Sequence, residues 1–236
     1  MLIGETLPFV NAYIEELDRT LRTLDPGAGL SSIRKGWLGF CVLAVIVTNS
    51  VCWKRFERAS LGRWHHPRLS WLFRQPQRFW QSVLHASVVV LLERYRITEV
   101  MVVLDDSDKL RCKTTTRIYK AHKLKDKTSG GTVNGQSVVL LLVVTPLVTI
   151  PAGMEFYGPD PAMTAWHKLT KALKKQGVPP KERPPKPSPN PLYPTKQAIG
   201  LRLLRDFCTH CPHLRIRGVL ADTLYGTSDF LDTASA

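Results

Sequence analysis

Acidic residues are scarce in this sequence, and the resulting charge imbalance narrows the partners that the chain can bind. Its 236 residues include 19 Asp and Glu against 33 Lys and Arg, a formal net charge of +14. A positive charge of this size favours polyanions and predicts binding that weakens as salt is added. Charge alone does not distinguish DNA from RNA or from an acidic membrane surface.

Long apolar runs are also lacking. The segment from Trp37 to Cys52 has sixteen residues and includes Thr48, Asn49 and Ser50, whereas a membrane-spanning helix needs roughly 20 apolar residues. We therefore expect a buried helix here and no membrane partner. The first thirty residues contain acids and no cationic lead before an apolar core, so we expect no signal peptide.

Cysteine is rare, odd in number and scattered over the five positions Cys41, Cys52, Cys112, Cys208 and Cys211. The last two form a CxxC pair, but a structural zinc site needs a second pair of ligands at suitable spacing, and none is evident. The cysteines therefore predict reduced thiols and no zinc.

Residues 1–98 have the periodicity of helices, and we interpret them as a DNA-binding region. Apolar residues recur at steps of three and four between residues 7 and 24, which predicts an amphipathic helix. Residues 38–51 are apolar on all sides and predict the core helix of this region. Residues 80–95 predict a further helix that leads into the first strand.

Basic and aromatic residues alternate between residues 53 and 74, which suggests a helix-turn-helix with Gly62 in the turn. The apolar members are expected to pack inward: Trp53, Phe56, Trp71, Leu72 and Phe73. The arginines are expected to contact phosphates: Arg55, Arg58, Arg63 and Arg68. The alternative is a helical cap that carries arginines for solubility.

The stretch EVMVVLDDSDK, from residue 99 to 109, is the central feature of the second half. Val100–Leu104 is short and rich in β-branched residues, which predicts a buried strand. Asp105, Asp106 and Asp108 follow at its end. Carboxylates at the carboxyl end of a buried strand lie at the rim of a sheet, where α/β proteins bind ligands and metals.

A basic run comes next, which we interpret as a second DNA-binding segment, with a solvated charged loop as the alternative. Its cations are Lys109, Arg111, Lys113, Arg117, Lys120, Lys123, Lys125 and Lys127. Asn134-Gly135 predicts a hairpin turn. The apolar residues 137–145 and the segment 146–156 predict two further strands.

The pattern of a short apolar strand followed by an acid recurs at residues 216–222, where Asp222 ends the strand. If the two strands are neighbours, Asp106 and Asp222 converge and can hold hard divalent cations for phosphoryl transfer. Between them, the sequence predicts a helix over 160–175 capped by Asp160, a proline-rich linker over 177–194 and a helix over 196–208.

Several motifs in this order resemble a bacterial insertion-sequence transposase of the DDE type. They are LDDSDKLR, HKLKDKTSGG with NGQS, FYGPDPAMTAW, YPTK and LADTLYG. The resemblance covers the chain from about Leu38 to its last residue. It implies an α/β fold in which an N-terminal helical region precedes a ribonuclease H-like mixed sheet with helices over residues 99–236, which is incomplete here.

The resemblance also implies a function and a site. It implies cleavage and joining of double-stranded insertion-sequence and target DNA with two Mg²⁺ ions, for which Mn²⁺ can substitute. The metal-binding aspartates carry over to Asp106 and Asp222, with Asp105 as the alternative for the first. It further implies a transposase dimer as a possible assembly and a location at the bacterial nucleoid, in the cytoplasm.

The third acid of the family, a glutamate on a helix beyond the second aspartate, has no counterpart in this sequence. Only fourteen residues follow Asp222, and they predict the start of a helix in a C-terminally truncated chain. Two functions therefore remain open: a metal-dependent transposase, and a DNA-binding fragment without catalysis that is a remnant or competitor of a full enzyme.

Overall fold

The computed structural model describes residues 7–126 and 128–235 of the chain. The chain divides into two compact units, Met1–Thr98 and Glu99–Ala236.

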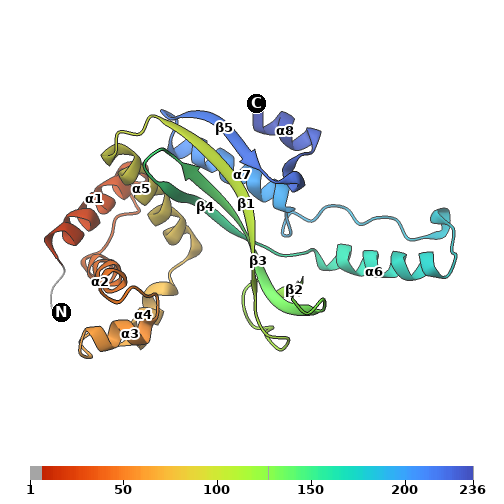
Figure 1. Ribbon diagram of the computed structural model, residues 1–236, viewed down its shortest axis with the longest axis horizontal. Helices are drawn as coiled ribbons and strands as arrows, with labels where there is room; N and C mark the ends of the chain where they lie inside the picture. The colour runs from red at the N-terminus through yellow and green to blue at the C-terminus, as the bar shows by residue number, and fades with distance from the viewer. Residues whose placement is uncertain (1–6, 127, 236) are drawn as a thin grey trace. The chain divides into compact units, whose positions relative to one another are not determined.

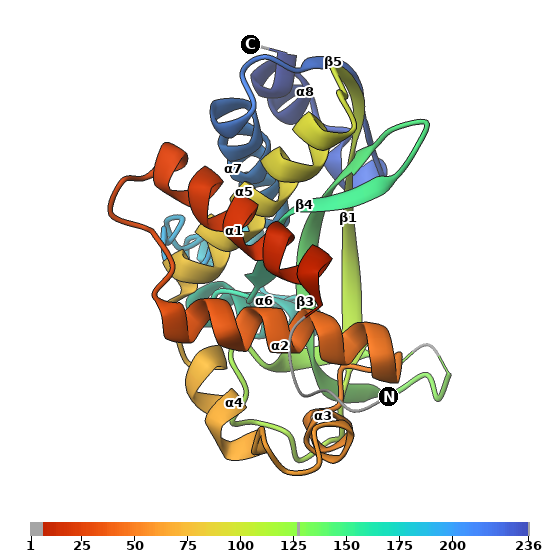
Figure 2. The ribbon, with the colours of Figure 1, turned by 90° about the vertical axis from the view of Figure 1, so that its left-hand side faces the viewer.

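The first unit is helical. Its helices are α1 (Pro8–Leu24), α2 (Ser32–Thr48), α3 (Trp53–Ala59), α4 (His66–Phe73) and α5 (Gln77–Arg94). Helix α2 packs against α1 on one side and against α3 and α4 on the other, while α5 packs against α1 (Figure 2). The predicted helices over 7–24, 38–51 and 80–95 are confirmed, with α2 beginning and ending earlier than expected.

The core of this unit follows from the spacing of its apolar residues. In α1, Val10, Ile14, Leu17 and Leu21 recur at steps of three and four and are at most 3% exposed. Around α2 the core is aromatic, and the ring of Phe40 stacks on Trp64 with centroids 4.7 Å apart. Stacked rings of this kind add stability beyond the area that they bury.

The inward packing expected of the 53–74 segment is partly wrong. Trp71 and Phe73 are 46% and 43% exposed, and Leu69 and Leu72 are the residues of α4 that are fully buried. Residues 69 and 72 are three positions apart in α4 and therefore share the face toward the core. Phe73 instead stacks between Trp53 and Trp80, with centroids 5.1 and 5.3 Å away.

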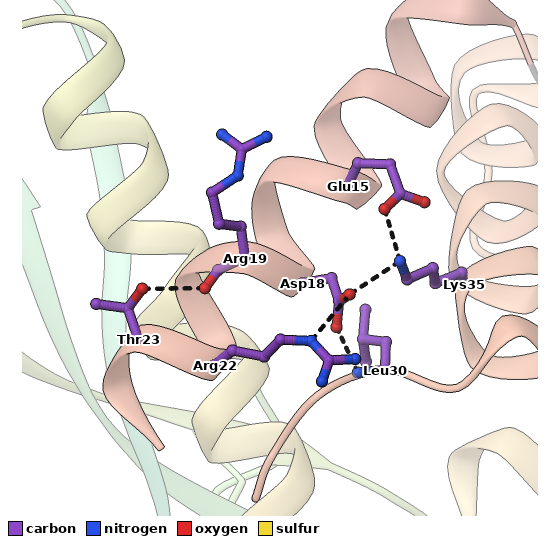
Figure 3. Close-up of polar contacts among 7 residues, drawn as sticks. All are labelled: Glu15, Asp18, Arg19, Arg22, Thr23, Leu30 and Lys35. Carbon is purple, nitrogen blue, oxygen red and sulfur yellow. Dashed lines mark hydrogen bonds and ion pairs between the residues drawn. The ribbon is translucent and has the colours of Figure 1, made fainter. Parts of the chain in front are cut away.

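A buried carboxylate, Asp18, ties the end of α1 to the start of α2 (Figure 3). It accepts hydrogen bonds from the amide of Leu30 at 2.6 Å and from Arg22 Nε at 3.3 Å, and its ion pair with Lys35 Nζ spans 2.8 Å. Burial raises the pKa of Asp18, but the hydrogen bonds from Lys35, Leu30 and Arg22 outweigh burial, so its pKa lies below the ordinary value.

In the second unit, the described residues form a five-stranded mixed sheet. Its strands are β1 (Glu99–Leu110), β2 (His122–Lys125), β3 (Thr132–Val144), β4 (Thr149–Tyr157) and β5 (Arg215–Ala221). Strand β3 lies antiparallel to β1, β2 and β4, whereas β5 pairs with β1 in parallel (Figure 1). The α/β class and the four strands expected from the sequence are confirmed, and β2 is an additional short strand.

One face of the sheet carries the core. Val102 and Leu104 of β1 lie beside Leu141 and Val143 of β3, and all four are at most 1% exposed. Helix α7 (Lys196–His210) packs on β3 and β4. It buries the face predicted from its periodicity, with Ile199, Leu203, Leu204 and Phe207.

Two sequence-based boundaries in the sheet are wrong. Strand β1 does not end at Leu104 but continues to Leu110, so Asp105, Asp106 and Asp108 lie within it. Asn134 and Gly135 lie inside β3 rather than in a hairpin turn, and the chain turns instead around Gly130, whose φ is +71°. Gly135 is needed for close approach, because a Cβ there would lie 2.6 Å from the Lys109 carbonyl oxygen.

Helix α6 (Pro161–Lys175) and the proline-rich segment form an arm that projects from the sheet (Figure 1). The predicted cap is confirmed, since Asp160 Oδ1 accepts from the amide of Ala162 at 2.8 Å. The linker is not fully free of packing, because Trp166 Nε1 donates to the carbonyl of Pro184 at 2.8 Å. The remaining elements are the short turns η1 (Pro180–Glu182) and η2 (Thr223–Tyr225) and helix α8 (Ser228–Ser235).

Within the described residues, no single helix has both the length and the apolar character to span a membrane. Helices α2 and α3 meet the length and composition test only as a pair, with a bend of 89° between them.

Asp18→Asn should destabilise the helical unit by about 2 kcal/mol at pH 7, because it removes hydrogen bonds to a buried charge. The Asp18 contribution is fully present above the unfolded-state pKa of about 3.9 and is lost as the pH falls through the lower folded-state pKa. Urea denaturation between pH 7 and pH 3 should therefore show a smaller pH dependence in the variant. Glu93→Gln, at an exposed position of α5, is the matched control; equal pH dependence in both variants would contradict the prediction.

Candidate functional site

The register between β1 and β5 brings the two predicted aspartates to neighbouring strands. Leu104 pairs with Ala221 in the parallel ladder, and this is the last pair. Asp105 and Asp106 follow Leu104, and Asp222 follows Ala221. The expectation that the two acid-bearing strands are neighbours is therefore confirmed.

Asp105 and Asp106 lie on opposite faces of the sheet, because side chains alternate along a strand. Asp106 shares the core face with Leu104 and its side chain is 17% exposed. Asp105 is exposed, and its Oδ1 accepts a hydrogen bond from the amide of Asp106 at 2.7 Å. Asp106 is therefore the acid directed toward α7.

Asp222 is exposed and caps the short turn η2. Its Oδ1 accepts a hydrogen bond from the amide of Leu224 at 2.9 Å. Among the described residues, the other carboxylate oxygen accepts no hydrogen bond. Asp222 also lies on the wall of an open pocket of about 480 Å³ between β5, α7 and α8.

Lys196 is a residue of the site that sequence reasoning did not single out. It is the first residue of α7, and its ammonium donates to Asp106 Oδ2 at 2.5 Å. The ammonium also lies 5.5 Å from the centre of the Tyr157 ring. The signal was present in the YPTK motif, but only the tertiary structure shows which acid this lysine meets.

Tyr225 is the second residue that sequence reasoning missed. It is 1% exposed, and its hydroxyl has no hydrogen-bond partner among the described residues. Burial, and then the negative charges of Asp106, Asp222 and Asp105, raise the pKa of Tyr225 to about 12. One buried hydroxyl is therefore within the electrostatic influence of all three aspartates.

The position of Tyr225 depends on a glycine in α7. A Cβ on Gly200 would lie 3.0 Å from the Tyr225 ring and 3.6 Å from Leu104. The absence of a side chain at residue 200 thus lets the ring lie close to α7, next to β1.

A second cluster of polar side chains, made of Asp108, Ser137 and His122, lies further along the same face of β1. Ser137 Oγ donates to Asp108 Oδ1 at 2.5 Å and lies 3.3 Å from His122 Nε2. The His122 ring meets the Tyr157 ring edge to face, with centroids 5.7 Å apart. The sheet face that carries the core between β1 and β3 therefore becomes polar beyond Leu104, and Tyr157 lies between the Asp106 and Asp108 groups.

The NGQS motif holds the basic loop against β3. Asn134 Nδ2 donates to the carbonyl of Lys113 at 2.8 Å, and Gln136 Nε2 donates to the carbonyl of Tyr119 at 2.7 Å. Sequence reasoning assigned this motif to a turn, but its amides fix a loop that is distant along the chain.

The described residues of the predicted DNA-binding set are exposed. In the helical unit, Gly62 lies between α3 and α4 with φ +76°, which confirms the expected turn at this glycine. That the two helices form a DNA-binding helix-turn-helix stays a prediction. The four arginines of this segment that are predicted to contact DNA are all exposed: Arg55, Arg58, Arg63 and Arg68. In the sheet unit the exposed cations are Lys109, Arg111, Lys113, Lys123 and Lys125. Lys127 lies outside the described residues.

Asp106 and Asp222 are the residues that could hold a divalent cation. Among the residues that the structure describes, no group of three or more His, Cys, Asp and Glu is close enough together to form a metal site by itself. Carboxylate oxygens are the ligand type that hard cations take, and a metal ion held by Asp106 and Asp222 stays a prediction.

No protein-family model, curated protein or solved structure matches this chain significantly.

Tyr225→Phe should raise the free energy of unfolding by about 1 kcal/mol in EDTA, because a buried hydroxyl without a partner costs roughly 1–3 kcal/mol. The measurement is urea denaturation followed by circular dichroism. Tyr119→Phe, at a 60% exposed position, should change stability by less than about 0.5 kcal/mol. A destabilised Tyr225→Phe variant would mean that the hydroxyl has a hydrogen-bond partner in the folded protein.

Proposed function

We propose that this chain is a DNA-binding protein of the DDE transposase type, in which Asp106 and Asp222 form a metal site for phosphoryl transfer. The observation that carries the proposal is the parallel pairing of β1 with β5, which ends at Leu104 and Ala221. Asp106 lies two residues after Leu104 and Asp222 one residue after Ala221, so two acids far apart in sequence come to the same end of the paired strands.

The strand order supports the ribonuclease H-like fold that the motifs imply. Strands β1, β3 and β4 are antiparallel neighbours, α7 follows, and β5 then pairs with β1 in parallel. This is the order expected for the first part of such a sheet. The expectation that both aspartates lie on central strands is met only for Asp106, because β1 is an inner strand of the described sheet whereas β5, which Asp222 follows, is its last strand.

The residues of the site have distinct roles in the proposed chemistry. Mg²⁺ or Mn²⁺, when bound, would supply a positive charge that polarises a phosphoryl oxygen. Asp106 and Asp222 would hold the ion, and Tyr225 would place a hydrogen-bond donor beside their carboxylates. Asp105, on the opposite face, would contribute negative charge rather than a direct contact.

The cationic surfaces support DNA as the partner. Exposed arginines on α3, α4 and the turn between them accompany exposed lysines and an arginine on β1, β2 and the loop between these strands. Contacts of this kind with phosphates release counterions and so provide affinity without sequence specificity.

A specific observation favours a second function, a DNA-binding fragment without catalysis. The Lys196 ammonium already neutralises Asp106 at 2.5 Å. A protein that binds DNA ends while Asp106 stays paired with a lysine would compete with a complete transposase for the same DNA.

DNA binding should depend steeply on salt. With about 5–8 phosphates contacted, the logarithm of the binding constant should fall with the logarithm of salt concentration with a slope of roughly −5 to −7. Changing Arg55, Arg58 and Arg63 together to Gln should reduce the size of the slope by up to about 3, as measured by fluorescence anisotropy with a labelled duplex.

The matched control removes the same charge from α6, at the exposed residues Lys168, Lys171 and Lys175, and should change the slope less. Binding that stays equal between low and high salt would exclude the proposed DNA contact.

The 236-residue chain should not detectably nick an insertion-sequence end in Mg²⁺ or Mn²⁺, because the motifs supply two of the three carboxylates. Losing electrostatic stabilisation of this kind commonly costs 10²–10³ in rate. The measurement is a nicking assay on a supercoiled plasmid that carries the end.

Specific nicking that Asp222→Ala abolishes would contradict this expectation. It would show that another acid, such as Asp229 or Asp232, completes the site, and it would select the transposase over the inactive DNA-binding fragment.

A further inference from the structure

The ammonium of Lys196 lies on the carboxylate where the proposed function puts a metal ion. The Nζ–Oδ2 distance to Asp106 is 2.5 Å, and the side chains of Lys196 and Asp106 are 21% and 17% exposed. Because both side chains are largely buried, dissolved salt screens this ion pair only weakly.

The position of Lys196 in its helix is unfavourable for a cation. It is the first residue of α7, where the helix dipole favours negative charge. Thr195 fixes this end of the helix, since its Oγ1 accepts from the amide of Ala198 at 3.1 Å. The ammonium is therefore held at a helix N-terminus, and its pairing with Asp106 offsets the cost.

The Lys196 ammonium makes a second favourable contact, with the ring of Tyr157. The Tyr157 ring centre is 5.5 Å from Nζ, and a cation near an aromatic face is stabilised without a carboxylate. The ring and the carboxylate contact the same ammonium, so Lys196 would keep one favourable contact if Asp106 bound another cation.

We propose that Lys196 is a placeholder cation: it neutralises Asp106 in the metal-free protein, and a divalent ion must displace it to bind. The displaced ammonium is then available to a DNA phosphate beside the site. This inference rests on the proposed function, and it makes metal binding and DNA binding at the site mutually supportive. Lys196 is a positioning residue in this scheme, because it acts through Asp106.

Removing the charge of Lys196 should strengthen binding of Mn²⁺ alone. Two cations near one carboxylate repel each other, so Lys196→Met should bind Mn²⁺ roughly tenfold more tightly than the unaltered chain. Lys196→Arg, which keeps the charge, should not. Lys171→Met, at an exposed position of α6, removes the same net charge elsewhere and should leave the Mn²⁺ affinity unchanged. The measurement is a titration of the full chain followed by the electron paramagnetic resonance of free Mn²⁺.

Thermal unfolding gives a second readout. Lys196→Met leaves the Asp106 charge without its partner, so its Tm should fall in EDTA and rise on addition of Mn²⁺ by more than the Tm of the unaltered chain. Lys196→Gln should behave in the same way and serves as a second variant if the methionine variant does not fold.

The outcomes separate the placeholder from the proposed metal site. If Asp222→Ala weakens Mn²⁺ binding while neither Lys196→Met nor Lys196→Gln strengthens it, the metal site stands and the placeholder is overturned. If neither the unaltered chain nor any Lys196 variant binds Mn²⁺, the metal site and the placeholder both fail. Tighter binding in both neutral variants, lost again on adding Asp222→Ala, is the result that we expect.

Discussion

The parallel pairing of β1 with β5 is the constraint on which the candidate site depends. The ladder ends at Leu104 and Ala221, so the acids that follow on each strand are placed by backbone hydrogen bonds rather than by contacts of their own. A parallel pair needs a long crossover connection, and here that connection contains α6, the proline-rich segment and α7. The same crossover delivers Lys196 and Gly200 to the site, the first to pair with Asp106 and the second to admit Tyr225.

The core and the site are one continuous face of the sheet. On β1 this face is apolar as far as Leu104 and becomes polar at Asp106 and Asp108, whereas on β3 it stays apolar through Val139, the partner of Asp106, and becomes polar at Ser137. The apolar part is closed by α7, whose N-terminus reaches the polar part. Side chains on packed strands are held more precisely than side chains on loops, so Asp106 has a rigid support.

The helical unit is stabilised differently. Its aromatic and aliphatic core is large, but the connection between α1 and α2 depends on one carboxylate, Asp18, which satisfies the Leu30 amide and two cations. Removing the Asp18 carboxylate would leave the buried Leu30 amide without its acceptor, whereas Lys35 keeps its ion pair with Glu15 and the Arg22 side chain is 56% exposed. The exposed arginines of α3 and α4 lie on the surface of this unit and are not part of its core.

The sequence alone determined the elements with strong periodicity or strong end signals. The face of α1, the face of α7, the Asp160 cap and the β-branched run of β1 each have a local physical cause, and each was predictable. The length of β1 was not, because polar residues continue a strand only when a neighbour such as β3 pairs with them. Asn134-Gly135 has the composition of a turn, yet the close approach of β1 overrides that local preference. The charges that meet Asp106 and the acids that surround Tyr225 come from segments far apart in the chain. Only the tertiary structure decided them, since long-range contacts leave no signal in local residue patterns.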